Sequence, residues 1–138
     1  MWWIYALLAA FFAALTAIFA KIGVENINSN LATAIRTFVV LIMISIIVYF
    51  RNKYKNIGEI TSRTWLFLTI SGVCTGLSWI FYFKALQMGE VSKVAGIDKL
   101  SLGLTIIFSV VFLGETISWK AALGAVLIII GTILLIFK

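Results

Sequence analysis

Residues 91–113 decide the fold, and they read VSKVAGIDKLSLGLTIIFSVVFL. The stretch is mostly apolar, and about 20 such residues are enough for a helix to cross a bilayer. It also contains Asp98 and Lys99, although a charged side chain inside lipid is costly and usually faces other helices or a water-filled cavity. The stretch therefore predicts a membrane-spanning helix with one face turned away from lipid.

Four further stretches share this apolar character, and together the five predict an all-α, polytopic membrane protein. They are too long for strands and too uniformly apolar for the surface helices of a soluble protein. The connections between them are short, which predicts a single domain over residues 1–138. The predicted transmembrane helices cover residues 2–20, 31–50, 65–86, 91–113 and 117–137.

The composition agrees with a membrane protein. Of the 138 residues, 63% are hydrophobic and 12% are charged, whereas a soluble domain has about 45–50% and about 25%. A soluble fold of this size could not hide so much apolar surface. The net charge of +6 is expected to orient the helices in the membrane, because no basic run interleaved with aromatic residues indicates nucleic-acid binding.

The same composition argues against an enzyme. The chain has no His, one Cys and five Asp and Glu residues. Pairs of nucleophile and base, and clusters of metal ligands, therefore lack their usual side chains. We expect no catalytic residue, no metal site and no cofactor.

Ionisable residues well inside the predicted spans point to a substrate cavity. On a helix, Asp98, Ser101 and Thr105 fall on one stripe beside Gly96, Lys99 and Gly103, and such a polar sector should face protein or water. Two structural alternatives stay open: Arg36 and Asp98 could form an ion pair, and Trp79 could be an ordinary core residue. The residues predicted to line the cavity are Arg36, Thr75, Trp79, Tyr82, Asp98, Lys99 and Ser101.

Glycines inside the spans are expected to let helices approach one another closely. Gly72 and Gly76 form a GxxxG pair in the third span. The fifth span is almost wholly aliphatic apart from Gly124, Gly131 and Thr132, which predicts a packing or dimerisation helix. The full set of predicted packing glycines is Gly72, Gly76, Gly96, Gly103, Gly124 and Gly131.

An odd number of spans places the two termini on opposite sides of the membrane. With the N-terminus inside, the inner loops carry Arg51, Lys53, Lys55, Arg63 and Lys120. The outer side then carries Lys21, Lys84, Lys93 and Lys138, with Arg36 and Lys99 deeper on that side. The excess of Lys and Arg that normally fixes orientation is therefore small, and insertion in both orientations is permitted.

Four motifs in order resemble the EamA family of the drug/metabolite transporter superfamily. Residues 76–89, GLSWIFYFKALQMG, resemble its third helix, and residues 94–115, ending in FLGE, resemble its fourth. LATAIRT at residues 31–37 resembles the start of its second helix, and residues 118–137 resemble its glycine-bearing last helix. Many members carry Pro near the position of Leu102, whereas this chain has none.

The resemblance implies a membrane transporter of small metabolites that works by alternating access, with Arg36, Trp79, Tyr82 and Lys99 near the cavity. Most members contain two five-helix halves, so this chain resembles one half of an inverted repeat. We expect an antiparallel homodimer in the cell membrane of a prokaryote, surrounded by lipid and binding a small-molecule substrate. A parallel dimer or a separate partner chain is the alternative assembly. A flippase subunit for a lipid-linked sugar and a non-transporting assembly or regulatory subunit are the alternative functions.

Overall fold

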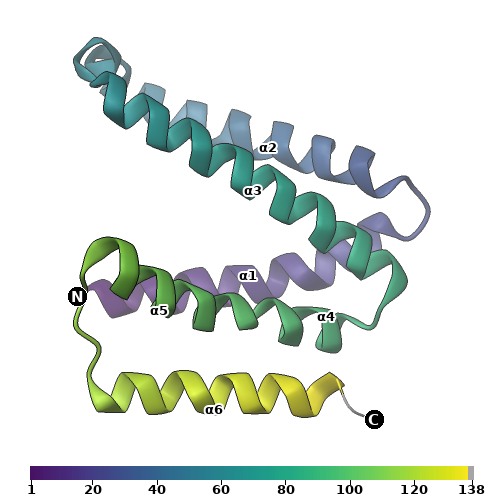
Figure 1. The fold of residues 1–138 in the computed structure, drawn as a ribbon. Coiled ribbons are helices and arrows are strands. Elements are labelled where there is room, and N and C mark those ends of the chain that lie inside the picture. The colour runs from purple at the N-terminus through teal and green to yellow at the C-terminus, as the bar shows by residue number, and fades with distance from the viewer. Residues whose placement is uncertain (137–138) are drawn as a thin grey trace. The chain divides into compact units, whose positions relative to one another are not determined.

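The computed structural model describes residues 1–136, and for Lys53, Lys55, Asn56 and Ile136 it describes the backbone alone. All the secondary structure of the described residues is helical (Figure 1). The elements are α1 (Trp2–Val24), α2 (Ser29–Phe50), the 3₁₀-helix η1 (Lys53–Glu59), α3 (Ser62–Met88), α4 (Val91–Asp98), α5 (Leu100–Leu113) and α6 (Trp119–Ile136).

The helices confirm the predicted all-α fold of a polytopic membrane protein. Four stretches are long and apolar enough to span a bilayer, namely Trp2–Val24, Ser29–Phe50, Ser62–Met88 and Val91–Leu113. The last helix is also apolar, and its segment Trp119–Leu135 is shorter. Its predicted end at Phe137 lies outside the described residues.

The fourth predicted span differs from a continuous helix, because it is interrupted at Lys99. α4 ends at Asp98 and α5 begins at Leu100. The backbone N–H of Lys99 donates to the carbonyl of Gly96 at 3.0 Å, and that of Leu102 donates to the carbonyl of Lys99 at 3.0 Å. Bonds to the third residue back, rather than the fourth, tighten the helix locally into a 3₁₀-type turn. The interruption therefore falls at Lys99 and next to Asp98, the two charged residues that lie well inside the span.

The chain divides into two compact units. The central unit comprises Phe19–Gln87, and the terminal unit comprises Met1–Ile18 together with the chain from Met88 onward. In the central unit α2 and α3 lie side by side and are joined through η1 (Figure 1). α2 ends at Phe50, and Asn52 adopts the left-handed conformation with φ 52° just before η1, which reverses the chain direction.

One end of the central unit is tightly closed. The side chains of Val24 and Leu86 have no exposed surface, and Phe83 is buried as well. Lys21 donates from Nζ to the carbonyl of Leu86 at 2.6 Å. Gln87 donates from Nε2 to the carbonyls of Val24 and Ile27 at 3.0 and 2.6 Å. The final carbonyls of a helix lack intrahelical partners. Lys21 of α1 therefore supplies a donor to the end of α3, and Gln87 of α3 supplies one to the end of α1.

In the terminal unit α4 and α5 pack along α6. A Cβ atom added to Gly96 would lie 2.8 Å from Cδ1 of Leu135, and one added to Gly103 would lie 2.8 Å from Cδ1 of Ile129. α5 ends at Leu113 and is followed by Gly114, whose φ of 67° is left-handed and favours glycine over other residues. The N–H of Gly114 donates to the carbonyl of Val110 at 3.2 Å. α6 then begins with a cap in which the Ser118 hydroxyl accepts from the N–H of Ala121 at 3.2 Å.

Candidate substrate site

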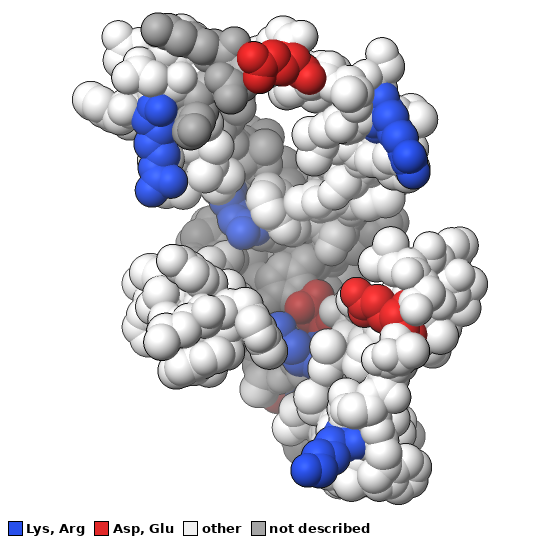
Figure 2. Space-filling model, turned by 90° about the vertical axis from the view of Figure 1, so that its left-hand side faces the viewer, with Lys and Arg blue, Asp and Glu red and all other residues white. Residues whose placement is uncertain are grey.

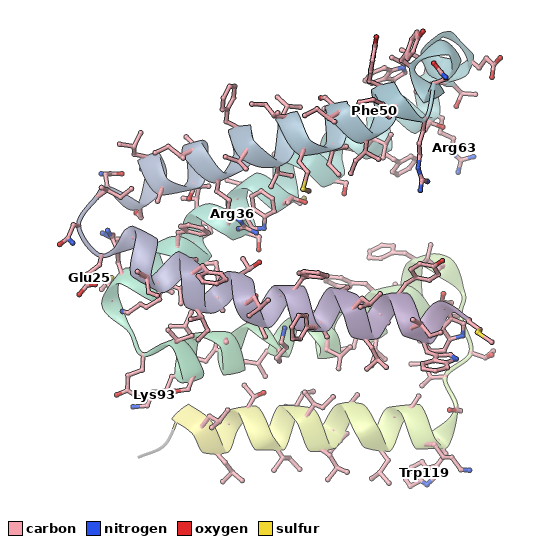
Figure 3. All side chains as sticks on the ribbon, turned by 180° about the vertical axis from the view of Figure 1, so that it is seen from behind. Glu25, Arg36, Phe50, Arg63, Lys93 and Trp119 are labelled. Carbon is pink, nitrogen blue, oxygen red and sulfur yellow. The ribbon has the colours of Figure 1, made fainter. Side chains whose placement is uncertain are left out.

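The guanidinium of Arg36 lies over aromatic rings of α3 (Figure 3). Its Cζ atom is 4.2 Å from the centroid of the Trp79 ring and 5.4 Å from that of Phe83. Trp79 and Phe83 are four residues apart, so they share one face of the helix. Tyr82 lies three residues after Trp79, on the same side of α3. The structure thus brings the predicted cavity residues Arg36 and Trp79 into contact, with Tyr82 beside Trp79 on α3.

Arg36 is directed into the span rather than toward its end. It lies seven residues after Ser29, where α2 begins, or roughly 10 Å along the helix at the usual rise. Trp79 lies nine residues before Met88, where α3 ends, or roughly 13 Å along that helix. A long basic side chain near a helix end often extends toward the membrane interface. The Arg36 side chain instead contacts the Trp79 ring, which lies at least as far from the helix ends as the Arg36 backbone does.

No carboxylate neutralises Arg36 within the central unit. The acidic residues of this unit are Glu25, which follows the end of α1, and Glu59, at the end of η1. Among the described residues, Arg36 forms neither an ion pair nor a hydrogen bond. Insertion of an Arg at the bilayer centre costs about 2.5–3.5 kcal/mol, and a desolvated cation–π contact offsets about 2 kcal/mol. Its N–H groups still require an oxygen partner.

Thr75 lies on the same side of α3. It precedes Trp79 by four residues and is exposed, and its hydroxyl donates to the carbonyl of Ser71 at 2.9 Å. The face of α3 that is turned toward Arg36 of α2 therefore includes Thr75, Trp79, Tyr82 and Phe83. Sequence reasoning missed Phe83, although its spacing of four residues from Trp79 was the signal that could have found it.

Asp98 and Lys99 form a second group, in the terminal unit. The Lys99 Nζ lies 3.6 Å from Oδ2 of Asp98, and their side chains are 60% and 43% exposed, respectively. The two charges cancel locally at the interruption between α4 and α5. Ser101 is exposed one turn further on, and its carbonyl accepts from the Thr105 hydroxyl at 2.8 Å. The alternative pairing of Arg36 with Asp98 stays a prediction, because the two residues belong to different units.

The predicted packing glycines fall into two classes. Gly96 and Gly103 are buried and contact α6. Among the described residues, no atom lies within 4 Å of a Cβ added to any of the other four. These four are Gly72, Gly76, Gly124 and Gly131.

The rest of the surface is poor in charge. On the face seen in Figure 2, Lys, Arg, Asp and Glu form isolated patches among uncharged residues. Apolar side chains along all the long helices are exposed, such as Phe12, Phe38, Phe81 and Leu134. Helices of this length and exposure, with charge only at their ends and at the two groups described above, define a polytopic membrane protein.

The chain belongs to the EamA-like transporter family, whose sequence profile matches residues 1–137. An uncharacterized transporter in the cobO 3′ region of Sinorhizobium sp is 50% identical over 134 residues, which cover 97% of this chain and 95% of that protein. An uncharacterized protein of Methanocaldococcus jannaschii is 33% identical over 132 residues, which cover 96% of this chain and 93% of that protein. No solved structure shows significant similarity to the chain. The family and the first relative support a membrane transporter, as the resemblance of the motifs predicts.

Proposed function

We propose that the protein transports small metabolites by alternating access and works as an antiparallel homodimer. The observation that carries the proposal is the length of its relatives. The Sinorhizobium and Methanocaldococcus relatives match over 95% and 93% of their own length. Each relative is therefore little longer than one five-helix half of the kind that resembles this chain. Many transporters enclose their substrate between two repeats of inverted topology. Two oppositely inserted copies of this chain would supply both repeats.

The charge distribution supports insertion in both orientations. With the N-terminus inside, five Lys and Arg residues are expected on the inner side and four on the outer side, with Arg36 and Lys99 deeper on the outer side. Orientation follows the excess of Lys and Arg in short loops, and an excess this small leaves both orientations open. A parallel dimer would require one orientation only.

The interruption at Lys99 supports alternating access. Irregular turns within membrane-spanning helices recur at the substrate and ion sites of secondary transporters. Lys99 keeps a right-handed helical backbone (φ −69°, ψ −12°), so the span is tightened at this point without being unwound. Here the interruption coincides with Asp98, the one carboxylate well inside a predicted span. If transport is coupled to protons, Asp98 is the residue we expect to carry them.

The open glycines support a second copy as the partner. Small residues at helix interfaces let backbones approach closely in membranes. Gly72 and Gly76 on α3, and Gly124 and Gly131 on α6, have no neighbour within 4 Å among the described residues. We propose that contacts between copies use these glycines, and that the protein resides in a prokaryotic cell membrane. We expect it to catalyse no covalent reaction.

Reporter fusions test the assembly. Two C-terminal fusions are compared, one active only inside the cell and one active only outside. Signal from both fusions is expected, and adding positive charge beside Lys120 should shift it toward one side. Signal from a single side would contradict the antiparallel homodimer and favour a parallel dimer or a separate partner chain.

Reconstitution tests the transport. Purified protein in liposomes is expected to give substrate-dependent flux for at least one class of small metabolite. Flux confined to lipid-linked sugars would favour the flippase reading. A complete lack of flux with correctly folded dimer would favour an assembly or regulatory subunit.

A further inference from the structure

The guanidinium of Arg36 has hydrogen-bond donors that no described residue accepts. A guanidinium carries five N–H donors in a planar fork, and the faces of Trp79 and Phe83 contact Arg36 without offering it an oxygen. No oxygen atom among the described residues accepts from Arg36. The aromatic rings therefore position the group while leaving its donors available.

We propose that Arg36 binds an oxyanion of the ligand, and that Trp79 and Phe83 hold its guanidinium in place for this contact. The inference rests on the proposed transport function and names the substrate class: molecules that carry a carboxylate or a phosphate. The planar fork of Arg matches both groups with two parallel hydrogen bonds. Stacking on the rings of Trp79 and Phe83 already restricts the Arg36 side chain. Less conformational entropy is therefore lost when the ligand binds.

The other deep cation is a weaker candidate for this contact. Lys99 already has a carboxylate partner, Asp98, at 3.6 Å. Within the central unit Arg36 has no such partner, because the acidic residues of that unit, Glu25 and Glu59, lie at helix ends. An uncompensated charge attracts an anion more strongly than one already paired, above all where little water screens it. The ligand therefore supplies the negative charge that the central unit lacks.

Two sources of oxyanion share this chemistry. A water-soluble metabolite would enter from the aqueous phase, whereas the phosphate of a lipid headgroup would enter from the bilayer. The position of Arg36 well inside the span favours a ligand drawn in from water, and the experiment separates the two sources.

Fluorescence of Trp79 tests the site directly. The full-length chain is prepared with Trp2, Trp3, Trp65 and Trp119 replaced by Phe, which leaves Trp79 as the single Trp, and is reconstituted in phosphatidylcholine liposomes. Quenching by iodide, an anion, is compared with quenching by acrylamide, which is neutral. Formate and inorganic phosphate serve as competing oxyanions, and formamide serves as the uncharged counterpart of formate.

Formate or phosphate is expected to reduce iodide quenching saturably, and formamide is not. Arg36→Met should remove this competition, and Arg36→Lys, which keeps the charge but loses the fork, should weaken it about tenfold. Arg63→Met is the matched control, because Arg63 also lies over a ring, that of Phe67 at 5.8 Å, but at the start of α3. It should leave the competition unchanged.

Each outcome decides the proposal. Competition that persists in Arg36→Met, or that is absent in folded single-Trp protein, would overturn it. Loss of iodide access on adding phosphatidylglycerol alone would support the oxyanion site and assign it to a lipid headgroup. The fluorescence test does not depend on transport. Competition without transport would support the oxyanion site and contradict the proposed function. Transport without competition would support the proposed function and contradict the oxyanion site. The helical content of each variant, measured by circular dichroism, confirms that it is folded.

Discussion

The central and terminal units each carry charge inside a span, and they compensate it by different means. In the central unit Arg36 lies over Trp79 and Phe83, and none of the described carboxylates of that unit pairs with it. In the terminal unit Lys99 lies next to Asp98, and the two form an ion pair. A cation next to a carboxylate is satisfied by the protein, whereas a cation beside aromatic rings still needs an anion from outside.

The largest effect is expected from removing the uncompensated cation. Arg36→Met should lower the uptake of small radiolabelled carboxylates into proteoliposomes about 100-fold, because two charge-assisted hydrogen bonds are lost. Lys99→Met should lower it less than about tenfold, because the charge removed is already paired. Equal losses in the two variants would break the comparison between the units.

A second prediction concerns the packing that supports α5. Gly103→Leu should destabilise the protein by about 1–3 kcal/mol, because the added side chain overpacks the contact with α6. The new Cβ would lie 2.8 Å from Ile129. Denaturant unfolding in detergent measures the loss. Gly131→Leu, where no described atom lies within 4 Å, serves as the control and should change monomer stability little.

A third prediction concerns the closed end of the central unit, which positions α3 beneath Arg36. Lys21→Met should cost about 1.5 kcal/mol of stability, because it removes a charged donor. The Leu86 carbonyl would lose the bond that it accepts at 2.6 Å. The matched control is Lys84→Met, whose side chain is exposed and makes no interaction with the described residues. Comparable melting temperatures for the two variants would count against a structural role of the Lys21 contact.

The smallest effect is expected at the ion pair itself. A double-mutant cycle of Asp98→Asn and Lys99→Met should give a coupling below about 1 kcal/mol in the unfolding free energy, as is usual for pairs that are partly exposed. Their exposed fractions are 43% and 60%. A coupling energy well above this value would mean that Asp98 and Lys99 are less accessible to water than their exposed fractions indicate.

The sequence predicts the spans well because apolar length is a local property. It also predicts that Arg36, Asp98 and Lys99 lie inside them, and Gly114 fits the αL position that ends α5. The stacking of Arg36 on Trp79 depends on the register of α2 against α3, which no local pattern encodes. The interruption at Lys99 was missed for a related reason: neither Gly nor Pro marks that position, and the apolar pattern continues across it.

Thiol accessibility tests the central claim most directly, namely that the face of α3 on which Trp79 contacts Arg36 of α2 lines an aqueous pathway. Thr75 lies on that face, whereas its neighbour Cys74, the single Cys of the chain, is about 140° away from Trp79 around the helix. Both residues are exposed. In proteoliposomes, Thr75→Cys in a Cys74→Ala background should react quickly with a water-soluble thiosulfonate, and formate should slow that reaction. Cys74 in the unmodified chain should react slowly. Equal rates at the two positions, or a Thr75→Cys thiol that does not react, would contradict the account.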